Sequence, residues 1–515
     1  MKPFCFLLLA LILFNCKEQV PKESVLGSVE FTVHGDEQAK PYFEKGLLLL
    51  HSFEYVDARE AFKKAQELDP NLAMAYWGEA MTYNHSLWSE QDFEEANAVI
   101  AELKQMEHLD ELSEIEQDFI EAVEILYTPK TSKNERDVKY RDFMGSLYEK
   151  YPGNNEVASF YALSQLGSVV GARNDSIFGQ GAVIAKQVLE DNPKHPGALH
   201  YLIHSYDDPY HAHLALDAAN SYSKVAPDAS HALHMPSHIY VALGMWDEVV
   251  SSNVASYGAS ITRKNAKELD NDARGYHSYH WLEYGYLQMD SINKARDMVW
   301  DMQKYTNELP SKRARTHMVF LKGTYLCETD DWDNAIVEIP IDVSGLRISI
   351  KAMNQFLDGY KAFYDKQPQQ LDSLIVDLEE KIQKESLLVD NLSQGAAFCA
   401  SVTRETPTQR SIDGSTVILT QLKALQAWLN EDVEKTETFL KASVAAQEAM
   451  SYSYGPPSIQ KPTHELYAEW LVAQKRYEEA LQQYELALER GPKRKLVEQG
   501  IQKVKMLLGD KVVME

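Results

Sequence analysis

The sequence has little that would support a disulfide scaffold or a cysteine-built metal site. Four cysteines occur in 515 residues. Cys5 and Cys16 lie in the N-terminal segment, whereas Cys327 and Cys399 stand alone without CxxC spacing. Those last two either pair in an oxidising compartment or remain separate buried thiols, and the sequence leaves both options open. Neither has the sequence context of a catalytic nucleophile.

Positive charge is also scarce, because 51 Lys and Arg residues stand against 77 Asp and Glu residues, for a formal net charge of -26. So acidic a surface repels phosphate backbones, and we therefore exclude nucleic acid as a partner. Charged residues at 25% and hydrophobic residues at 44% are ordinary for globular proteins, which excludes wholesale disorder.

Long apolar runs are missing after the N-terminus. The run from Phe4 to Phe14 follows Lys2, is too short to span a bilayer, and suits the apolar core of a signal peptide. It ends at Leu13-Phe14-Asn15-Cys16, which resembles a bacterial lipobox. We therefore expect a signal peptide at 1–15, lipid on Cys16, a polar tether at 16–38, and an envelope location at the outer membrane, on its periplasmic or surface face. The membrane contact would be through the lipid alone. An ordinary secretory signal or a retained anchor is the alternative.

The sequence lacks strand–helix alternation, a glycine-rich phosphate loop, HExxH and GxSxG. What it does contain is a helical repeat. Between Tyr42 and Pro70, six residues fall at positions 8, 17, 20, 24, 27 and 32 of the 34-residue tetratricopeptide (TPR) pattern: Gly46, Tyr55, Ala58, Phe62, Ala65 and Pro70. The same positions recur near the C-terminus in Ala468, Tyr477, Ala480, Tyr484, Ala487 and Pro492.

Weaker repeats connect these two ends. Pro193 and Pro227 lie 34 residues apart, and Trp246, Ile292 and Trp332 each take position 17, where a second helix begins. The pattern predicts an all-α, TPR-like solenoid of about ten to twelve antiparallel hairpins, wound into a right-handed superhelix with a concave groove. We expect N-terminal repeats at 39–127, central repeats at 138–337 and C-terminal repeats at 346–515.

Histidine is concentrated in one part of this solenoid. Ten of the 16 histidines lie between His195 and His280. In the TPR register, the pair His200 and His204 occupies positions 5 and 9 of a first helix, and His234 with His238 occupies the same positions one repeat later. Residues four apart share a helix face, so these side chains are expected in one trough.

Paired neutral imidazoles on adjacent helices are typical ligands of zinc, copper or iron. The predicted metal ligands are His200, His204, His234, His238, His231 and His195. A further set is expected to line the groove or to support the ligands: His277, His280, Asp207, Asp208, Tyr284 and His317. Pro236 should kink the helix that carries His238.

Three hypotheses follow for function. In the first, the groove holds a histidine-built metal site and binds a ligand or a partner protein. In the second, the same histidines serve a metal-dependent hydrolase or oxidase, with Asp207, Asp208 or Glu283 as the acid or base. In the third, the groove is metal-free and binds an extended peptide.

The strings HPGALHYLIH (195–204) and HALHMPSHIY (231–240) resemble a family of uncharacterised bacterial TPR proteins in lipoprotein form. The likeness extends to FEKGLLLLHSFEYVDAREAFKKAQELDPNLAMAYWGEA (43–80) and YGPPSIQKPTHELYAEWLVA (454–473), so it spans nearly the whole chain after the signal peptide. The resemblance implies the TPR solenoid and favours the six histidines of these strings as the site. It implies no catalytic role.

Overall fold

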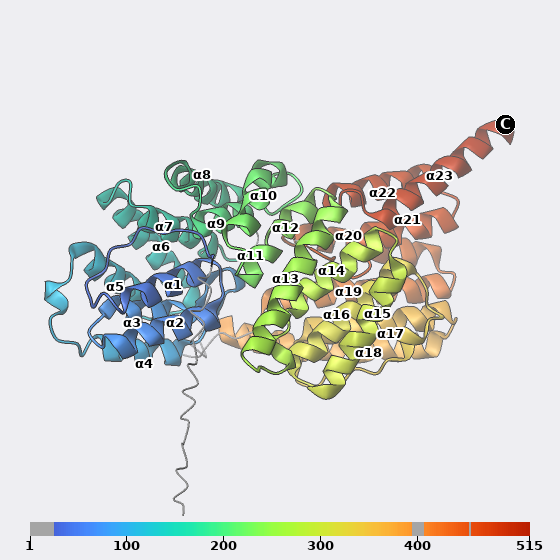
Figure 1. The fold of residues 1–515 in the computed structure, drawn as a ribbon. Helices are drawn as coiled ribbons and strands as arrows, with labels where there is room; N and C mark the ends of the chain where they lie inside the picture. The colour runs from blue at the N-terminus through green and yellow to red at the C-terminus, as the bar shows by residue number, and fades with distance from the viewer. Residues whose placement is uncertain (1–24, 172, 394–405, 453–454, 515) are drawn as a thin grey trace, which may run out of the picture.

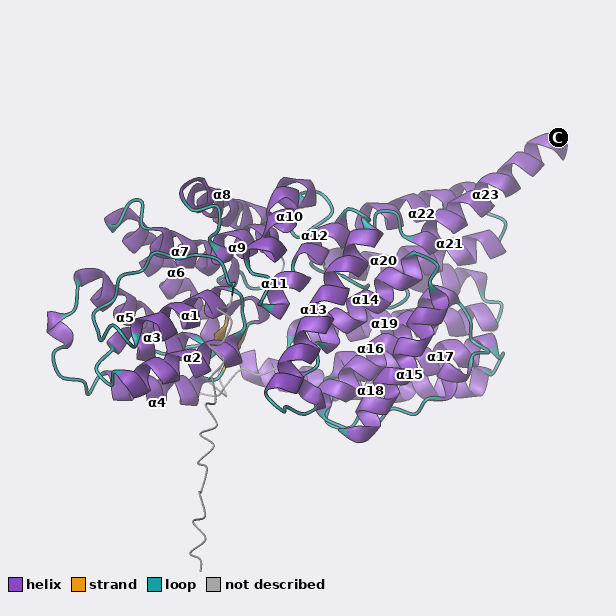
Figure 2. Cartoon of the chain, in the orientation of Figure 1, coloured by secondary structure: helices purple, strands orange, loops and turns teal. Residues whose placement is uncertain are grey.

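The computed structural model describes residues 25–171, 173–393, 406–452 and 455–514. Within these ranges the chain is almost wholly helical, and the one strand pair joins β1 (Asn84–His85) antiparallel to β2 (Glu90–Gln91) (Figure 2). None of the described helices combines the length and apolar character that spanning a bilayer requires. The expected signal peptide at 1–15, the lipidation site Cys16 and the second lone cysteine, Cys399, lie outside the described residues.

The helices form a solenoid in which neighbours along the chain pack as antiparallel pairs (Figure 1). The N-terminal part contains α1 (Lys40–His51), α2 (Tyr55–Leu68), α3 (Ala73–Met81), α4 (Phe93–Leu103), α5 (Glu114–Leu126), α6 (Lys133–Lys150), α7 (Asn155–Gly167), α8 (Asp175–Asp191), α9 (Pro196–Ser205), α10 (Leu216–Val225), α11 (Ser230–His234) and α12 (Pro236–Ala242). The C-terminal part contains α13 (Trp246–Ala266), α14 (Tyr276–Gln288), α15 (Ile292–Glu308), α16 (Lys312–Thr329), α17 (Ile348–Tyr364), α18 (Pro368–Ser393), α19 (Gln409–Leu429), α20 (Val433–Ala449), α21 (Thr463–Ala473), α22 (Tyr477–Arg490) and α23 (Lys495–Met514). Short 3-10 turns are η1 (Ser86–Trp88), η2 (Leu109–Glu111), η3 (Ala212–Ala215), η4 (Asn271–Ala273) and η5 (Ala335–Glu338).

At both ends of the solenoid, residues of the TPR signature determine how neighbouring helices pack. Phe62 of α2 lies between Gly46 of α1 and Gly78 of α3, and a Cβ atom at either glycine would overlap its ring. Tyr484 of α22 meets Gly500 of α23 in the same way. Small residues therefore let three successive helices close on one aromatic side chain, which makes each hairpin depend on its neighbour. The all-α, TPR-like solenoid predicted from the sequence is the observed fold.

The central repeats depart from the prediction after α16. A second helix was expected to begin at Trp332, but the structure has only η5 between α16 and α17. Pro340 explains the difference, because proline offers no N–H and disfavours a helical residue before it. Gly345 then adopts a left-handed φ of 68°. Trp332 is nevertheless buried, stacked on Tyr360 of α17 with ring centroids 4.5 Å apart.

The break predicted at Pro236 is confirmed. α11 ends at His234 and α12 begins at Pro236, so the two histidines His234 and His238 lie on separate short helices. The hydroxyl of Ser237 donates to the carbonyl oxygen of His234 at 2.7 Å. The carbonyl oxygen of His234 is therefore satisfied at the interruption.

The described part of the expected tether packs against the solenoid. Leu26 and Val33 are buried, and the N–H of Val25 donates to Asp228 at 2.7 Å. Nδ1 of His34 lies 2.5 Å from Glu116. The polar composition of 16–38 suggested a free segment, but Leu26 and Val33 are buried against the N-terminal repeats. Residues 25–38 are therefore part of the packed structure.

The N-terminal repeats are arranged in a curve that brings α2 into contact with α13. Arg263 of α13 forms two hydrogen bonds of 2.6 Å with Asp57 of α2, and Lys267 adds a third at 2.7 Å. Glu54, at the start of α2, accepts hydrogen bonds from the Ser230 hydroxyl and the His231 N–H. The first hairpin therefore lies against α11 and α13, and the helices between them form a closed turn with an enclosed inner face.

The inner face is further covered by residues 450–452 and 455–462, the described part of the chain between α20 and α21, which we call the α20–α21 segment. Ser451 accepts a hydrogen bond from the N–H of Arg173 at 2.6 Å. Gly455 packs against Trp281 of α14, and Gln460 donates to the carbonyl oxygen of Val319 on α16 at 3.2 Å. The segment thus runs along the first helices of successive hairpins, where the sequence predicted an open groove.

Candidate metal centre

The structure brings six of the predicted site histidines together inside the closed turn, on α9, α11, α12 and α14. They form two sets in which one ligand atom of each residue lies within 4.8 Å of the others. The first histidine set is His200, His204 and His231, and the second is His234, His238 and His277. A third group overlaps both, because His204 and His238 also meet at Asp207. His277 is exposed, whereas the others are buried or, for His231, half-buried.

In the second set, His234 and His238 face each other through Nε2 atoms 3.1 Å apart. The Nδ1–H of His238 donates to Oδ2 of Asp207 at 2.6 Å, and the Nδ1–H of His234 donates to Oδ1 of Asn253 at 2.7 Å. The amide nitrogen of Asn253 donates to the carbonyl of Val249, which fixes the amide orientation. A neutral imidazole carries one proton, so while Asp207 is ionised and accepts from Nδ1 of His238, both Nε2 atoms present lone pairs to each other.

The first set is oriented in the same way. The Nδ1–H of His200 donates to the carbonyl oxygen of His51 at 2.8 Å, which leaves a lone pair on its Nε2. That atom lies 3.2 Å from Nε2 of His231. The ring of His204 follows one turn along α9, 4.9 Å from the ring of His200 between centroids. The carbonyl oxygen of His51 therefore decides which nitrogen of the His200 ring is available.

Burial keeps these imidazoles in their neutral form. Desolvation lowers the pKa of His200, His204, His231 and His238 well below the usual value, and the neighbouring imidazoles act in the same direction. Desolvation also lowers the pKa of His234, to about 4, although its hydrogen bond to Asn253 opposes this. Neutral imidazole is the form that binds metal ions, so at pH 7 few protons compete for the lone pairs.

Asp207 connects the two sets. Its Oδ2 accepts from His238 and lies 3.8 Å from Nδ1 of His204, and its Oδ1 is buried without a hydrogen-bond partner among the described residues. Burial raises the pKa of Asp207, with Asp208 adding to the effect and Arg173 opposing it. The guanidinium of Arg173 itself is 3.0 Å from Asp208. A buried carboxylate with only imidazoles in contact favours a cation nearby.

His195 lies elsewhere, in a buried cluster with His51 and Glu156. Its Nδ1 accepts from the N–H of Ala198 and caps α9, and its Nε2 lies 3.0 Å from Glu156. His51 contacts Glu156 through Nε2 and the hydroxyl of Tyr201 through Nδ1, both at 2.8 Å. Burial would raise the pKa of Glu156, but the two imidazoles outweigh it and hold the pKa at about 2. The ligand atoms of His51, Glu156 and His195 also lie within 4.8 Å of one another, but all four ring nitrogens already have a contact and neither histidine set includes His195.

Two more predicted histidines lie outside both sets, at the contact between α14 and α16. Nε2 of His280 is 2.8 Å from the hydroxyl of Thr324, and the Nδ1–H of His317 donates to the carbonyl of Arg313 at 2.8 Å. His280 also stacks on Phe320. His280 shares α14 with His277 but, like His317, belongs to neither histidine set.

The remaining predicted residues also have other neighbours. Asp208 pairs with Arg173 and with His211, and Tyr284 accepts a hydrogen bond from Arg494 at 3.1 Å. Glu283 is fully buried, and neither carboxylate oxygen has a hydrogen-bond partner within the described residues. Burial raises its pKa, and the charge of Glu328 does so further. Nothing places Asp208 or Glu283 beside the facing histidine nitrogens.

Sequence reasoning missed the aromatic side chains beside the first set. The ring of Phe53 lies 4.2 Å from the ring of His200, and Tyr55 stacks on Phe53 at 5.3 Å. Trp88, which is 37% exposed, lies 6.2 Å from the ring of His231. No repeat register relates residues 53–88 to the histidine strings, because the closed turn brings them together through long-range contacts.

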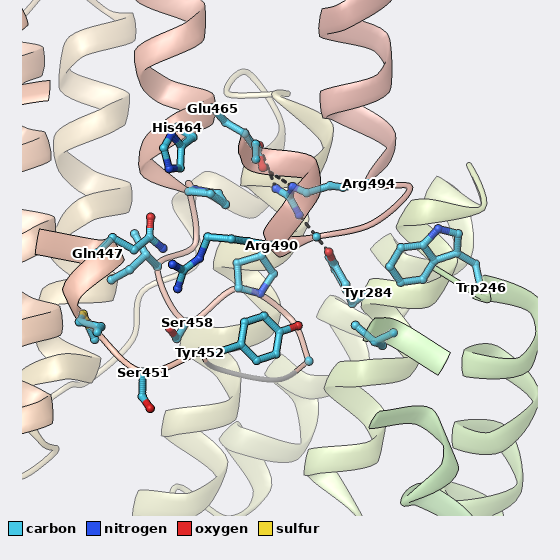
Figure 3. Close-up of a pocket in the computed structure, with 18 residues that line it drawn as sticks. Trp246, Tyr284, Gln447, Ser451, Tyr452, Ser458, His464, Glu465, Arg490 and Arg494 are labelled. Carbon is cyan, nitrogen blue, oxygen red and sulfur yellow. Dashed lines mark hydrogen bonds and ion pairs between the residues drawn. The ribbon is translucent and has the colours of Figure 1, made fainter. Parts of the chain in front are cut away.

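A separate pocket opens between the α20–α21 segment and α12 to α14 (Figure 3). It encloses about 790 Å³ of space including its open mouth, and none of the residues that line it belongs to either histidine set. The side chains of Tyr452 and Arg490 point into it, and His464 lies at its edge (Figure 3). Arg494 behind them is buried in ion pairs with Glu328 and Glu465.

Fold and site together define a TPR-like α-solenoid with a histidine cluster enclosed in its N-terminal turn. No protein-family model matches the chain, and no curated protein matches it. Among solved structures, yeast Tom70 is similar at 12% identity over 92% of this chain and 89% of that one, with a TM-score of 0.33. The Cut9 complex with Hcn1 is similar at 11% identity over 93% and 78%, with a TM-score of 0.35. The TPR domain of P58(IPK) is similar at 12% identity over 92% and 99%, with a TM-score of 0.20.

Proposed function

We propose that this protein is an envelope lipoprotein whose TPR-like scaffold binds a transition-metal ion on its inner histidines and uses that site to hold a ligand or partner. The observation that carries the proposal is the facing pair His234 and His238. Their Nε2 atoms are 3.1 Å apart, and each Nδ1–H is committed to an acceptor. While Asp207 is ionised, the two lone pairs that face each other in this buried site repel, and a shared metal ion would convert this repulsion into two bonds.

The spacing of the pair supports a common ion. Two nitrogen ligands held at about 2.05 Å from one ion with a tetrahedral angle between them lie about 3.3 Å apart. His277 completes the second set and is exposed to solvent, which would leave one side of the ion accessible. Zinc, copper and iron all accept imidazole ligands, and the ligand types do not distinguish between them.

An accessible side also supports a second candidate, a metal-dependent enzyme. An ion with an open position lowers the pKa of bound water and can act on a ligand that approaches past His277. Asp207 is the carboxylate closest to this chemistry, because it already holds the Nδ1–H of His238. The binding function requires only the metal, so it is the first proposal.

The location of the protein rests on its first residues. A signal peptide at 1–15 and a lipid on Cys16 would place the solenoid at the outer membrane, on its periplasmic or surface face. A peptide partner would have to bind beside the α20–α21 segment, since that segment already covers much of the inner face. Globomycin treatment during expression is the direct check, because accumulation of the unprocessed precursor is expected only for a lipoprotein.

Elemental analysis tests the metal proposal. The full chain is purified in detergent without a metal-affinity column and measured by mass spectrometry, and about one or two ions per chain are expected. The His234→Ala/His238→Ala variant should lose the ion held by this pair while keeping its helical circular dichroism. The matched control is His280→Ala/His317→Ala, which removes two histidines outside the sets and should keep the metal.

A negative result in this elemental analysis would be equally informative. Wild-type protein that is metal-free and takes up no zinc, copper or iron at micromolar concentrations would overturn the metal proposal. The inner face would then be assigned to a peptide or organic ligand.

A further inference from the structure

We infer that the site holds two metal ions side by side, one on the first histidine set and one on the second, with Asp207 between them. This inference rests on the proposed metal-binding function and adds the number of ions and their arrangement.

The first step is that one ion cannot take all six histidines as they are placed. Ligand atoms on a single ion lie within about 4.2 Å of each other, which is twice the bond length of about 2.1 Å. Within the described part of the chain, no group that meets a 4.8 Å limit joins His200 or His231 with His234 or His277. The two sets share no residue, and the overlapping group of His204, Asp207 and His238 takes only one histidine from each, so we assign each set its own position.

The second step is that two nitrogens of each set already have the spacing of ligands on one ion. The closest nitrogens of the first set, on His200 and His231, are 3.2 Å apart. Those of the second set, on His234 and His238, are 3.1 Å apart. Both values lie close to the separation of about 3.3 Å expected for two ligands on one tetrahedral ion. Each set therefore supplies its own pair of closely spaced nitrogen ligands.

The third step is the placement of Asp207. It contacts His204 of the first set at 3.8 Å and His238 of the second at 2.6 Å, and both contacts are made by Oδ2. Its buried Oδ1 has no hydrogen-bond partner among the described residues. The ionised carboxylate of Asp207 lies among neutral imidazoles of both sets. A metal ion on each side would best compensate its negative charge, and Oδ1 is left to contact such an ion.

The scaffold gives the two positions different surroundings. The first lies beside Phe53 and is approached past Trp88, whereas the second lies under Trp281, whose ring stacks on His238 at 4.4 Å. The first ion would therefore sit behind an aromatic entrance on the N-terminal side. The second would open toward His277 on the other side.

A cobalt(II) titration of the wild-type full chain, freed of metal with a chelator, counts the ions without any substitution. Visible absorbance of histidine-bound cobalt should saturate at about two equivalents per chain. The His200→Ala/His231→Ala and His234→Ala/His238→Ala variants should each saturate at about one equivalent. The His280→Ala/His317→Ala control should saturate at two, and circular dichroism shows that each variant is folded.

The outcomes separate this inference from the proposal on which it rests. Saturation of wild-type protein at one equivalent, with cobalt lost in one double variant and kept in the other, overturns the two-ion arrangement and leaves metal binding intact. Saturation at one equivalent that both double variants abolish also overturns it, because it indicates a single shared position. No binding at all overturns the proposed function itself.

Discussion

Nδ1 of His238 donates to Oδ2 of Asp207 across 2.6 Å, and this hydrogen bond decides what the other side of the ring can do. With the proton held on Nδ1, the lone pair of Nε2 points at His234. A carboxylate that fixes the tautomer of a ligating histidine also raises its basicity. Asp207, from the loop after α9, would thus prepare His238 for the metal-ligand role that we propose.

The first prediction concerns this carboxylate. In Asp207→Asn the side chain keeps its shape and loses its charge, so zinc affinity should fall about 10–100-fold. Competition with a chelator of known affinity measures the change. Asp208→Asn is the matched control, since Asp208 is paired with Arg173 and should affect stability without affecting zinc affinity. Equal zinc affinities in wild-type and Asp207→Asn proteins would remove Asp207 from the site.

The second prediction tests the helix contact at Phe62. A methyl group added in Gly78→Ala would overlap the buried Phe62 ring, so the free energy of unfolding should fall by about 1–3 kcal/mol. Gly179→Ala in α8 is the control, because no atom lies within 4 Å of its Cβ position. That substitution should raise the free energy of unfolding by about 0.5–1 kcal/mol through helix propensity. Urea denaturation measures both, and similar effects at the two sites would contradict the packing argument.

The repeat and the histidine faces were predictable because both depend on local spacing. Phe62 and Tyr484 recur at one position of a 34-residue pattern, and the same register placed His200 and His234 on equivalent faces. The helix missing after Trp332 was the local error, and Pro340 was its visible cause. Patterns of this kind depend on residues that are close together in the sequence, so they can be recognised without knowledge of the fold.

The enclosure of the site was not predictable in this way. Phe53 contacts His200, and Asp57 contacts Arg263, although no repeat period relates these positions in the sequence. His195 belongs to one histidine string in the sequence but caps α9 with one nitrogen and meets Glu156 with the other. Curvature accumulates from small rotations at each hairpin, and the sequence pattern does not specify their sum.

The third prediction is a pH dependence at His280. Burial lowers the pKa of His280 to about 3 in the folded protein. The unfolded chain binds a proton near pH 6.5, so the contribution of the neutral ring is complete above pH 6.5 and is lost as the pH falls toward 3. In metal-free protein, His280→Gln should therefore lose less thermal stability than wild type between pH 7 and pH 5. The same substitution at the exposed His108 is the control, and a wild-type slope in His280→Gln would contradict the argument.

The fourth prediction concerns Arg494, which joins three helices behind the pocket of Figure 3. Its guanidinium pairs with Glu328 of α16 and Glu465 of α21 and donates to the hydroxyl of Tyr284 on α14. Arg494→Met would leave two buried carboxylates without their cation, so the free energy of unfolding should fall by about 3–5 kcal/mol. Arg490→Met, on the same pocket, should change it by less than about 0.5 kcal/mol, because only a partly buried side chain is altered. Urea denaturation compares the two variants. Restoring most of the lost stability with Glu328→Gln/Glu465→Gln in the Arg494→Met background would show that the stranded charges, and not lost packing, cause the effect.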